Sequence, residues 1–104
     1  MDDDNKKQVI VGRNFFGMVV SIYEYIKKSS PQNAENFRAG IRDKMEMVES
    51  HPRAFPLIYS ENHPEENIEY RYIHYMKTFK IIYKLPKGLI GHWEYCMINK
   101  VMKQ

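Results

Sequence analysis

The spacing of the hydrophobic residues changes once along this chain, and this change limits the folds that are open to it. From residue 15 to residue 48 they recur every three or four positions, which is the period of an amphipathic helix. From residue 68 onward they mostly alternate with other residues, which is the period of a half-buried strand. A short β-branched run, Val9-Ile10-Val11, precedes the helical part and predicts a further strand. The chain is therefore expected to have an α+β fold, with helices on one face of a mostly antiparallel four-stranded sheet.

Two helices are predicted, one from about residue 14 to residue 28 and one from residue 31 to about residue 50. Ser30 followed by Pro31 is typical of a helix start, because serine caps the free N–H groups and proline at the first position loses no hydrogen bond. The second helix should end before Pro52, which disfavours helical geometry in the residue that precedes it. The short connection predicts an antiparallel helical hairpin.

Three strands are predicted in the C-terminal part, over residues 68–75, 78–85 and 89–98. Their short connections favour an antiparallel meander. Successive side chains of a strand point to opposite faces, so the apolar set of each strand should meet the helices. Met97 is assigned to that covered side. The residues expected on the other, open face are Arg71, Lys80, Lys84, His92, Glu94 and Cys96.

The length and composition indicate one small cytoplasmic domain. A chain of 104 residues has the usual size of one domain, predicted here over residues 8–104 after a flexible leader at residues 1–7. No apolar run approaches the roughly 20 residues of a membrane span, and the polar N-terminus is not a secretion signal. The single cysteine excludes an internal disulfide, and no spacing of histidine and cysteine predicts a metal site or a cofactor.

The positive charge of the chain is concentrated in its last third. Residues 69–104 carry seven lysines and arginines against two glutamates, among many aromatic residues. A basic, aromatic surface attracts nucleic acid or an acidic protein segment. An ordinary sheet with solvated lysines is the alternative interpretation. Tyr70 and Tyr72 are expected to pack within the sheet rather than to stack on bases.

Three segments carry a resemblance to a known family. Residues 21–26, then Ser30-Pro31 with Ala34 and Phe37, and finally Tyr70-Arg71 followed by residues 79–84 resemble the RelE/ParE toxin superfamily of bacterial type II toxin–antitoxin systems. The resemblance covers about residues 9–100, and the predicted order of elements is also the order in that family. It implies a growth-inhibiting toxin that a cognate antitoxin neutralises. The antitoxin is expected to be acidic and to fold on binding.

The resemblance also implies one of two targets. Members of the RelE branch cleave mRNA on the ribosome, whereas those of the ParE branch poison DNA gyrase and have no nuclease activity. The RelE pattern has an arginine on the second strand of the meander, where this chain has Lys80. It has another arginine after the last strand, close to the position of Lys100. Both lysines keep the charge but lose the bidentate guanidinium. Arg71 matches the arginine that the superfamily shares. The lysine positions of that pattern hold Asn67 and Glu69, and its closing tyrosine has no counterpart. These departures favour the ParE-like mode, in which the protein acts by binding.

Two alternatives stay open. The first is a ribosome-dependent mRNA endoribonuclease of the RelE kind with a variant site, in which His92 is the base and Glu94 orients it. Arg71 and Lys80 would then hold the phosphate. The second is a degenerate, non-toxic family member that only binds a partner. The candidate catalytic residues are Arg71, Lys80, His92, Glu94 and Lys100.

Overall fold

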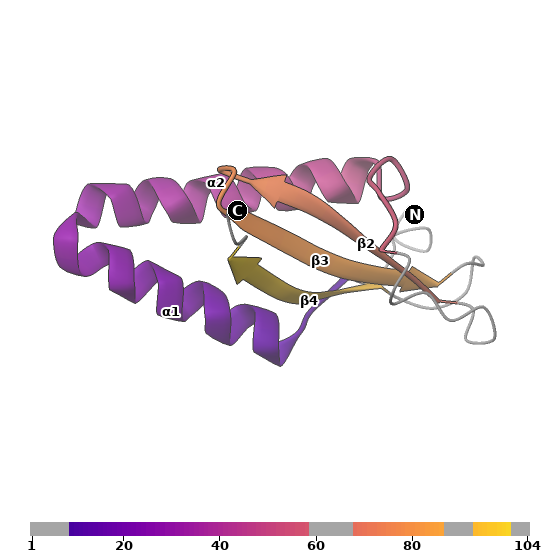
Figure 1. The fold of residues 1–104 in the computed structure, drawn as a ribbon, viewed down its shortest axis with the longest axis horizontal. Helices are drawn as coiled ribbons and strands as arrows, with labels where there is room; N and C mark the ends of the chain where they lie inside the picture. The colour runs from indigo at the N-terminus through magenta and orange to yellow at the C-terminus, as the bar shows by residue number, and fades with distance from the viewer. Residues whose placement is uncertain (1–8, 59–67, 87–92, 101–104) are drawn as a thin grey trace, which may run out of the picture.

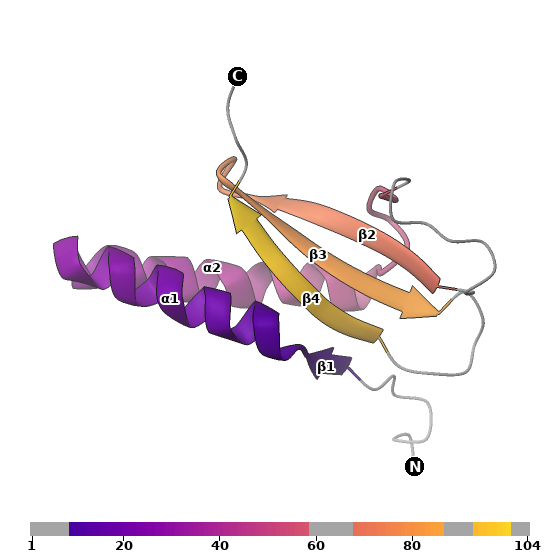
Figure 2. The ribbon, with the colours of Figure 1, turned by 60° about the horizontal axis from the view of Figure 1, so that its bottom comes forward.

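The computed structural model describes residues 9–58, 68–86 and 93–100 of the chain. The elements along it are β1 (Val9–Val11), α1 (Arg13–Ser29), α2 (Pro31–Ser50), β2 (Ile68–Tyr75), β3 (Phe79–Pro86) and β4 (Trp93–Lys100). The strands form one sheet in the order β1-β4-β3-β2, in which β1 is parallel to β4 and the other pairs are antiparallel. Both helices lie on the same side of this sheet (Figure 1, Figure 2). The predicted α+β fold is confirmed.

A single serine ends α1 and begins α2. The Ser30 N–H donates to the Ile26 carbonyl at 2.9 Å, and the Ser30 hydroxyl oxygen accepts from the Asn33 N–H at 3.1 Å.

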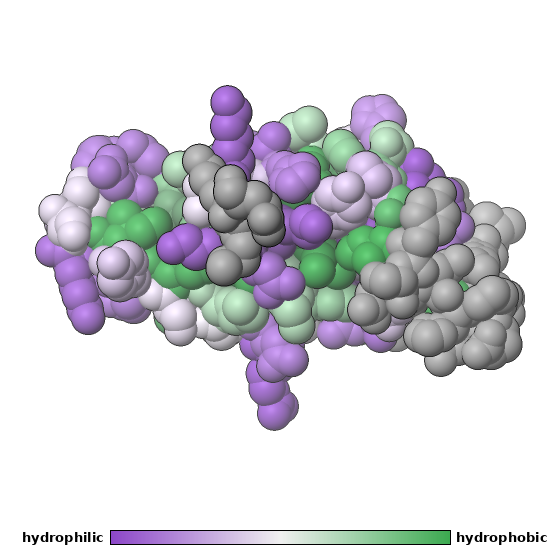
Figure 3. Space-filling model, viewed as in Figure 1, coloured by the Kyte–Doolittle hydropathy of each residue, from purple (hydrophilic) through white to green (hydrophobic). Residues whose placement is uncertain are grey.

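A side-chain hydrogen bond also links the two helices. The Tyr23 hydroxyl donates to the Glu35 carboxylate, and this hydrogen bond lowers the pKa of Glu35. The hairpin extends beyond the end of the sheet, and hydrophobic surface is visible between α1 and α2 at this end (Figure 1, Figure 3). The predicted antiparallel hairpin is therefore present.

A β-bulge in β4 corrects one predicted face. Ile82 of β3 lies opposite Met97, but the next residue, Tyr83, lies opposite Tyr95, so Cys96 is an extra residue in the ladder. Beyond such a residue the alternation of side chains shifts by one position. Ile98, rather than Met97, is consequently buried beyond the bulge, and the prediction that Met97 faces the helices was wrong. The strand also ends at Lys100 rather than at residue 98, while residues 1–7 and 87–92 lie outside the described part of the chain.

Three buried tyrosines, one on each of the strands β2, β3 and β4, fasten the sheet to α2. A buried hydroxyl needs a hydrogen-bond partner, and each of these finds one on the helix or on the residues that follow it. The Tyr95 hydroxyl also lies 3.0 Å from Glu49 Oε2. The donated bonds are Tyr75 to the Phe37 carbonyl at 2.9 Å, Tyr95 to the Met45 carbonyl at 3.0 Å and Tyr83 to the Pro52 carbonyl at 2.6 Å.

Gly40 lets α2 approach the sheet closely at one of these tyrosines. A Cβ atom built on Gly40 would lie only 2.7 Å from the Cζ atom of Tyr75. The ring of Tyr75 therefore occupies the space that any larger residue would need. Gly17 lies in an exposed part of α1, and a Cβ atom built on it would have no neighbouring atom within 4 Å. A larger residue therefore fits at this position.

Alanine at the two helical glycines should change stability in opposite directions. Gly17→Ala should raise the free energy of unfolding by about 0.5–1 kcal/mol, because alanine favours a helix more than glycine does. Gly40→Ala should lower it by about 1–3 kcal/mol, because the new methyl group overlaps the Tyr75 ring. Urea denaturation of both variants measures the two changes. A gain in stability at Gly40 would contradict the close contact.

The buried tyrosines should make the fold sensitive to alkali. Burial raises the pKa of Tyr83 to about 12, and the same cause raises the pKa values of Tyr75 and Tyr95. Between pH 10 and 12 the unfolded chain has lost the Tyr83 proton while the folded chain keeps it, so stability falls as the pH rises. The expected contribution of Tyr83 is about 1.4 kcal/mol for each pH unit in this range. Denaturation curves of the protein and of Tyr83→Phe from pH 8 to 12 should differ by that slope, and parallel curves would contradict the assignment.

Candidate functional site

The face of the sheet that lies away from the helices is the candidate site, and we call it the open face. Directly opposed residues of an antiparallel pair have their side chains on the same face. The positions that alternate with the buried Ile73, Ile81 and Tyr83 therefore define it. None of the side chains on this face is fully buried. The open face consists of Tyr70, Tyr72, His74, Lys80, Ile82, Lys84, Glu94, Met97 and Asn99.

An aromatic and cationic cluster occupies the part of the open face near the turn between β2 and β3. The Lys80 ammonium lies 4.5 Å from the centre of the Tyr72 ring, within the range of a cation–π interaction. The imidazole of His74 meets the same ring edge-on, with the ring centres 5.4 Å apart. Lys80 is also the residue opposite His74 in the ladder. One tyrosine ring thus holds an ammonium group and an imidazole side by side on an accessible surface.

The other part of the open face carries a compensated pair of charges. Lys84 Nζ lies 3.7 Å from Glu94 Oε1, and both side chains are partly exposed. Tyr70 is the residue opposite Lys84 on β2. An exposed ion pair of this kind contributes little to stability, and a partner can replace it at small cost. Within the described residues, Lys80 has no carboxylate at ion-pair distance, so it carries the uncompensated positive charge of this face.

The structure divides the predicted catalytic residues between two faces of the sheet. Lys80 and Glu94 lie on the open face, as predicted. Arg71 lies opposite the buried Tyr83, and Lys100 lies opposite Phe79, which packs against the core, so both are on the helix side. The assignment of Arg71 to the open face was wrong, because it alternates in phase with the buried residues of β2. His92 lies outside the described residues.

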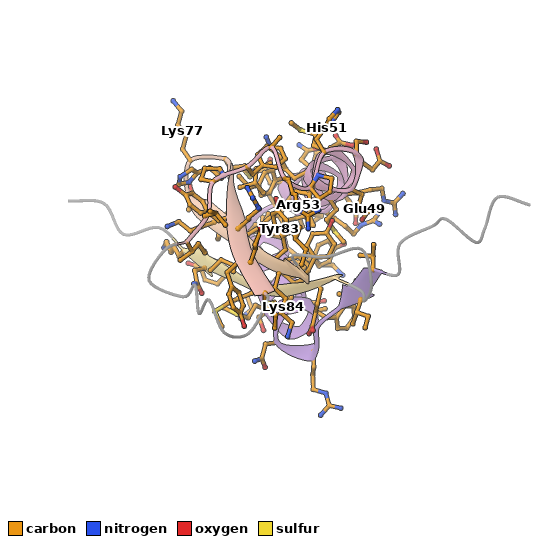
Figure 4. The ribbon with its side chains drawn as sticks, turned by 90° about the vertical axis from the view of Figure 1, so that its right-hand side faces the viewer. Glu49, His51, Arg53, Lys77, Tyr83 and Lys84 are labelled. Carbon is orange, nitrogen blue, oxygen red and sulfur yellow. The ribbon has the colours of Figure 1, made fainter. Side chains whose placement is uncertain are left out.

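Arg71 anchors the segment that follows α2. Its guanidinium donates to the carbonyl oxygens of Phe55 at 2.6 Å and of Arg53 at 3.1 Å, and it forms an ion pair with Glu69 at 2.9 Å. Glu69 in turn lies 3.7 Å from the Arg53 side chain. Figure 4 looks onto this end of the molecule, where Arg53 and Tyr83 lie close together beyond the end of α2. This arrangement gives Arg71 a structural role.

The anchored segment also extends the sheet. The Ile58 N–H donates to the Tyr70 carbonyl at 2.8 Å, and the Tyr72 N–H donates to the Pro56 carbonyl at 3.1 Å. Leu57 is bridged to Arg71 in the same antiparallel sense. This edge of β2 is therefore covered in part by the chain itself, which limits pairing with other molecules there.

Cys96 has the properties of a structural thiol. It is half-buried at the bulge, and burial together with the charge of Glu94 raises the pKa of its thiol. A raised pKa keeps the sulfur protonated and unreactive near neutral pH. In the described part of the chain, no three histidine, cysteine, aspartate or glutamate side chains come together as a metal site would require. No described helix is long and apolar enough to cross a membrane.

Tyr72 and His74 form the cluster with Lys80, and the sequence interpretation named neither of them as a site residue. Tyr72 was expected to pack within the sheet, and His74 was not among the candidate residues. The signal was present in the two-residue spacing, because Tyr70, Tyr72 and His74 alternate with the apolar Ile73. Burial of Ile73 fixes which of the two sets is exposed.

No protein-family model matches the sequence, and no curated protein matches it significantly.

Removing the Arg71 guanidinium should destabilise the protein. Arg71→Gln should lower the free energy of unfolding by about 2–3 kcal/mol, because it removes the nearer of the two cations beside the partly buried Glu69 and the charged donor of two carbonyl groups. Arg42→Gln, on an exposed position of α2, is the matched control and should change stability by less than about 0.5 kcal/mol. Urea denaturation compares the two. Equal, small effects would show that Arg71 does not anchor the segment.

Proposed function

We propose that this chain is the toxin of a type II toxin–antitoxin system, of the RelE/ParE superfamily, and that it acts in the ParE-like way by binding a target such as DNA gyrase. Support comes from the resemblance of its sequence motifs and from the order of its elements, a strand, two helices and a three-stranded meander. The cognate antitoxin is an acidic protein that folds on binding. Since gyrase and ribosomes are in the cytoplasm, this proposal also assigns the chain to the cytoplasm.

The observation that carries the proposal is the cluster of Lys80, Tyr72 and His74 on a sheet face that no described helix covers. An ammonium group over an aromatic ring offers both charge and apolar contact to an acidic protein surface. Aromatic and basic residues of this kind are also the ones that dominate binding at protein interfaces. These properties suit recognition of a macromolecule.

The positions of Arg71 and Lys100 favour binding over catalysis. Cleavage of RNA requires a base, an acid and cations that reach the same phosphate group within hydrogen-bond distance. Arg71 points to the helix side and is engaged by Glu69 and by backbone carbonyls, so it cannot share a phosphate with Lys80. Lys100 is on the helix side as well.

A RelE-like endoribonuclease is the second candidate, because the open face does hold one imidazole beside one ammonium group. His74 could take the proton from a ribose hydroxyl while Lys80 neutralises the phosphate. This arrangement differs from the pair of His92 and Glu94 that the sequence suggested. It requires that the imidazole leave its edge-on contact with Tyr72 when RNA binds.

Controlled expression in a bacterium should arrest growth, and the double variant Tyr72→Ala/Lys80→Glu should relieve the arrest by at least tenfold in colony count. The expected cause is the loss of the Tyr72 ring and the reversal of the charge at position 80. Arg42→Glu reverses a charge on α2, away from the open face, and should leave the arrest unchanged. Circular dichroism of the purified variants confirms that each one is folded.

The mode of arrest separates the candidates. Induction of the DNA-damage response with intact mRNA supports the ParE-like mode. Rapid loss of mRNA that depends on His74 supports the endoribonuclease and overturns the binding proposal. A folded protein that causes no arrest contradicts both and leaves a family member that only binds a partner.

A further inference from the structure

The outward face of α1 carries hydrophobic side chains that do not contribute to the core. The helix packs against α2 and β4, and the face that points away from both is exposed. Phe16 is 61% exposed and Val20 is 40% exposed on this face, and they are neighbours because four residues separate them along the helix. We call this exposed set the α1 stripe: Arg13, Phe16, Gly17, Val20 and Glu24.

Gly17 lies within the α1 stripe and has no packing role in the chain itself. Glycine inside a helix is less stable than alanine, and no described atom lies near the Cβ that another residue would carry here. Gly40 differs, because it makes room for the ring of Tyr75. The distance between two packed helices depends on the side chains at their contact, so a glycine permits close approach. Gly17 is therefore suited to contact with a helix of another molecule.

The two ends of the α1 stripe carry opposite charges. Arg13 is the first residue of α1, where the helix dipole favours negative charge, and the first turn contains no acidic residue. Glu24 lies at the other end of the stripe. Neither side chain forms an ion pair within the described parts of the chain. A carboxylate from another molecule would compensate the charge of Arg13, and a cation would compensate that of Glu24.

The order of the residues makes the α1 stripe complementary to itself. The steps from Arg13 through Gly17 and Val20 to Glu24 are four, three and four residues, which are the same in either direction. If two such helices lie antiparallel about a two-fold axis, Arg13 of each copy lies beside Glu24 of the other. Gly17 then lies beside Val20 of the other copy, with Phe16 next to this contact. A parallel arrangement in register would bring like charges together.

We infer that two copies of this chain form a dimer through antiparallel α1 helices. Phe16 and Val20 provide its apolar centre, and Arg13 and Glu24 pair at both ends. The inference does not depend on the proposed function. Because α1 lies on the helix side of the sheet, the contact leaves both open faces uncovered (Figure 2). A contact between two single helices is small, so we expect a dissociation constant on the order of 10 μM.

A charge exchange tests the pairing. Sedimentation velocity of the full chain from about 3 to about 300 μM, with a reducing agent that keeps Cys96 a thiol, should show a change from monomer to dimer. Glu24→Arg should weaken the dimer about tenfold, because it repels Arg13 of the other copy. The double variant Arg13→Glu/Glu24→Arg exchanges the two charges and should restore the affinity to within about threefold. Glu46→Arg, on an exposed position of α2, is the matched control and should leave the dimer unchanged.

Gly17→Gln separates the contact from folding. Glutamine favours a helix more than glycine does, so the circular dichroism of this variant should stay helical, while its side chain keeps the two helices apart and weakens the dimer about tenfold. A chain that stays monomeric up to about 300 μM overturns the inference. A dimer that resists Glu24→Arg or Gly17→Gln, or that the charge exchange does not restore, also overturns it, because the contact is then made by another surface. Toxicity is not measured, so a failure of the proposed function leaves this test unaffected.

Discussion

The hydroxyl groups of Tyr75, Tyr83 and Tyr95 are the interaction on which the rest of the structure depends. Each hydroxyl group lies on a buried side chain and needs a hydrogen-bond acceptor there. Each donates to a carbonyl oxygen, either of α2 or of Pro52, which follows α2. Because the three bonds come from three strands, they fix both the distance and the rotation of α2 against the sheet. They thereby determine which face of the sheet is covered and which is left open.

Much of this fold follows from short-range patterns in the sequence. The helical spacing, the Ser30-Pro31 start and the alternation in β3 predict the helices, their hairpin and the covered face of the middle strand. The bulge at Cys96 does not follow from them, because an extra residue leaves no mark on composition or spacing. It changes the face of every later residue in β4, and this is why Met97 was assigned to the wrong side.

The site was harder to predict than the fold, for a related reason. Lys80 is placed by the alternation around it, whereas Arg71 sits in a strand whose two faces both carry large, partly polar residues. Its orientation is decided by carbonyl groups of residues 53 and 55, in a segment with no periodic pattern. A sequence pattern does not predict the orientation of a side chain whose hydrogen-bond partners lie in an irregular segment of the backbone. The open face that results has Tyr72 in contact with both Lys80 and His74.

The parallel pairing of β1 with β4 has a consequence for how the chain assembles. Val9 lies beside Trp93, so the first strand of the sheet has its partner at the other end of the chain. During synthesis on a ribosome, the helical hairpin can form early from contacts between neighbours in sequence, but β1 must wait until β4 has emerged. Until then its β-branched residues present an unpaired backbone edge, which favours association with other chains. The nascent protein therefore passes through a stage in which a chaperone could bind the unpaired β1 strand and prevent this association.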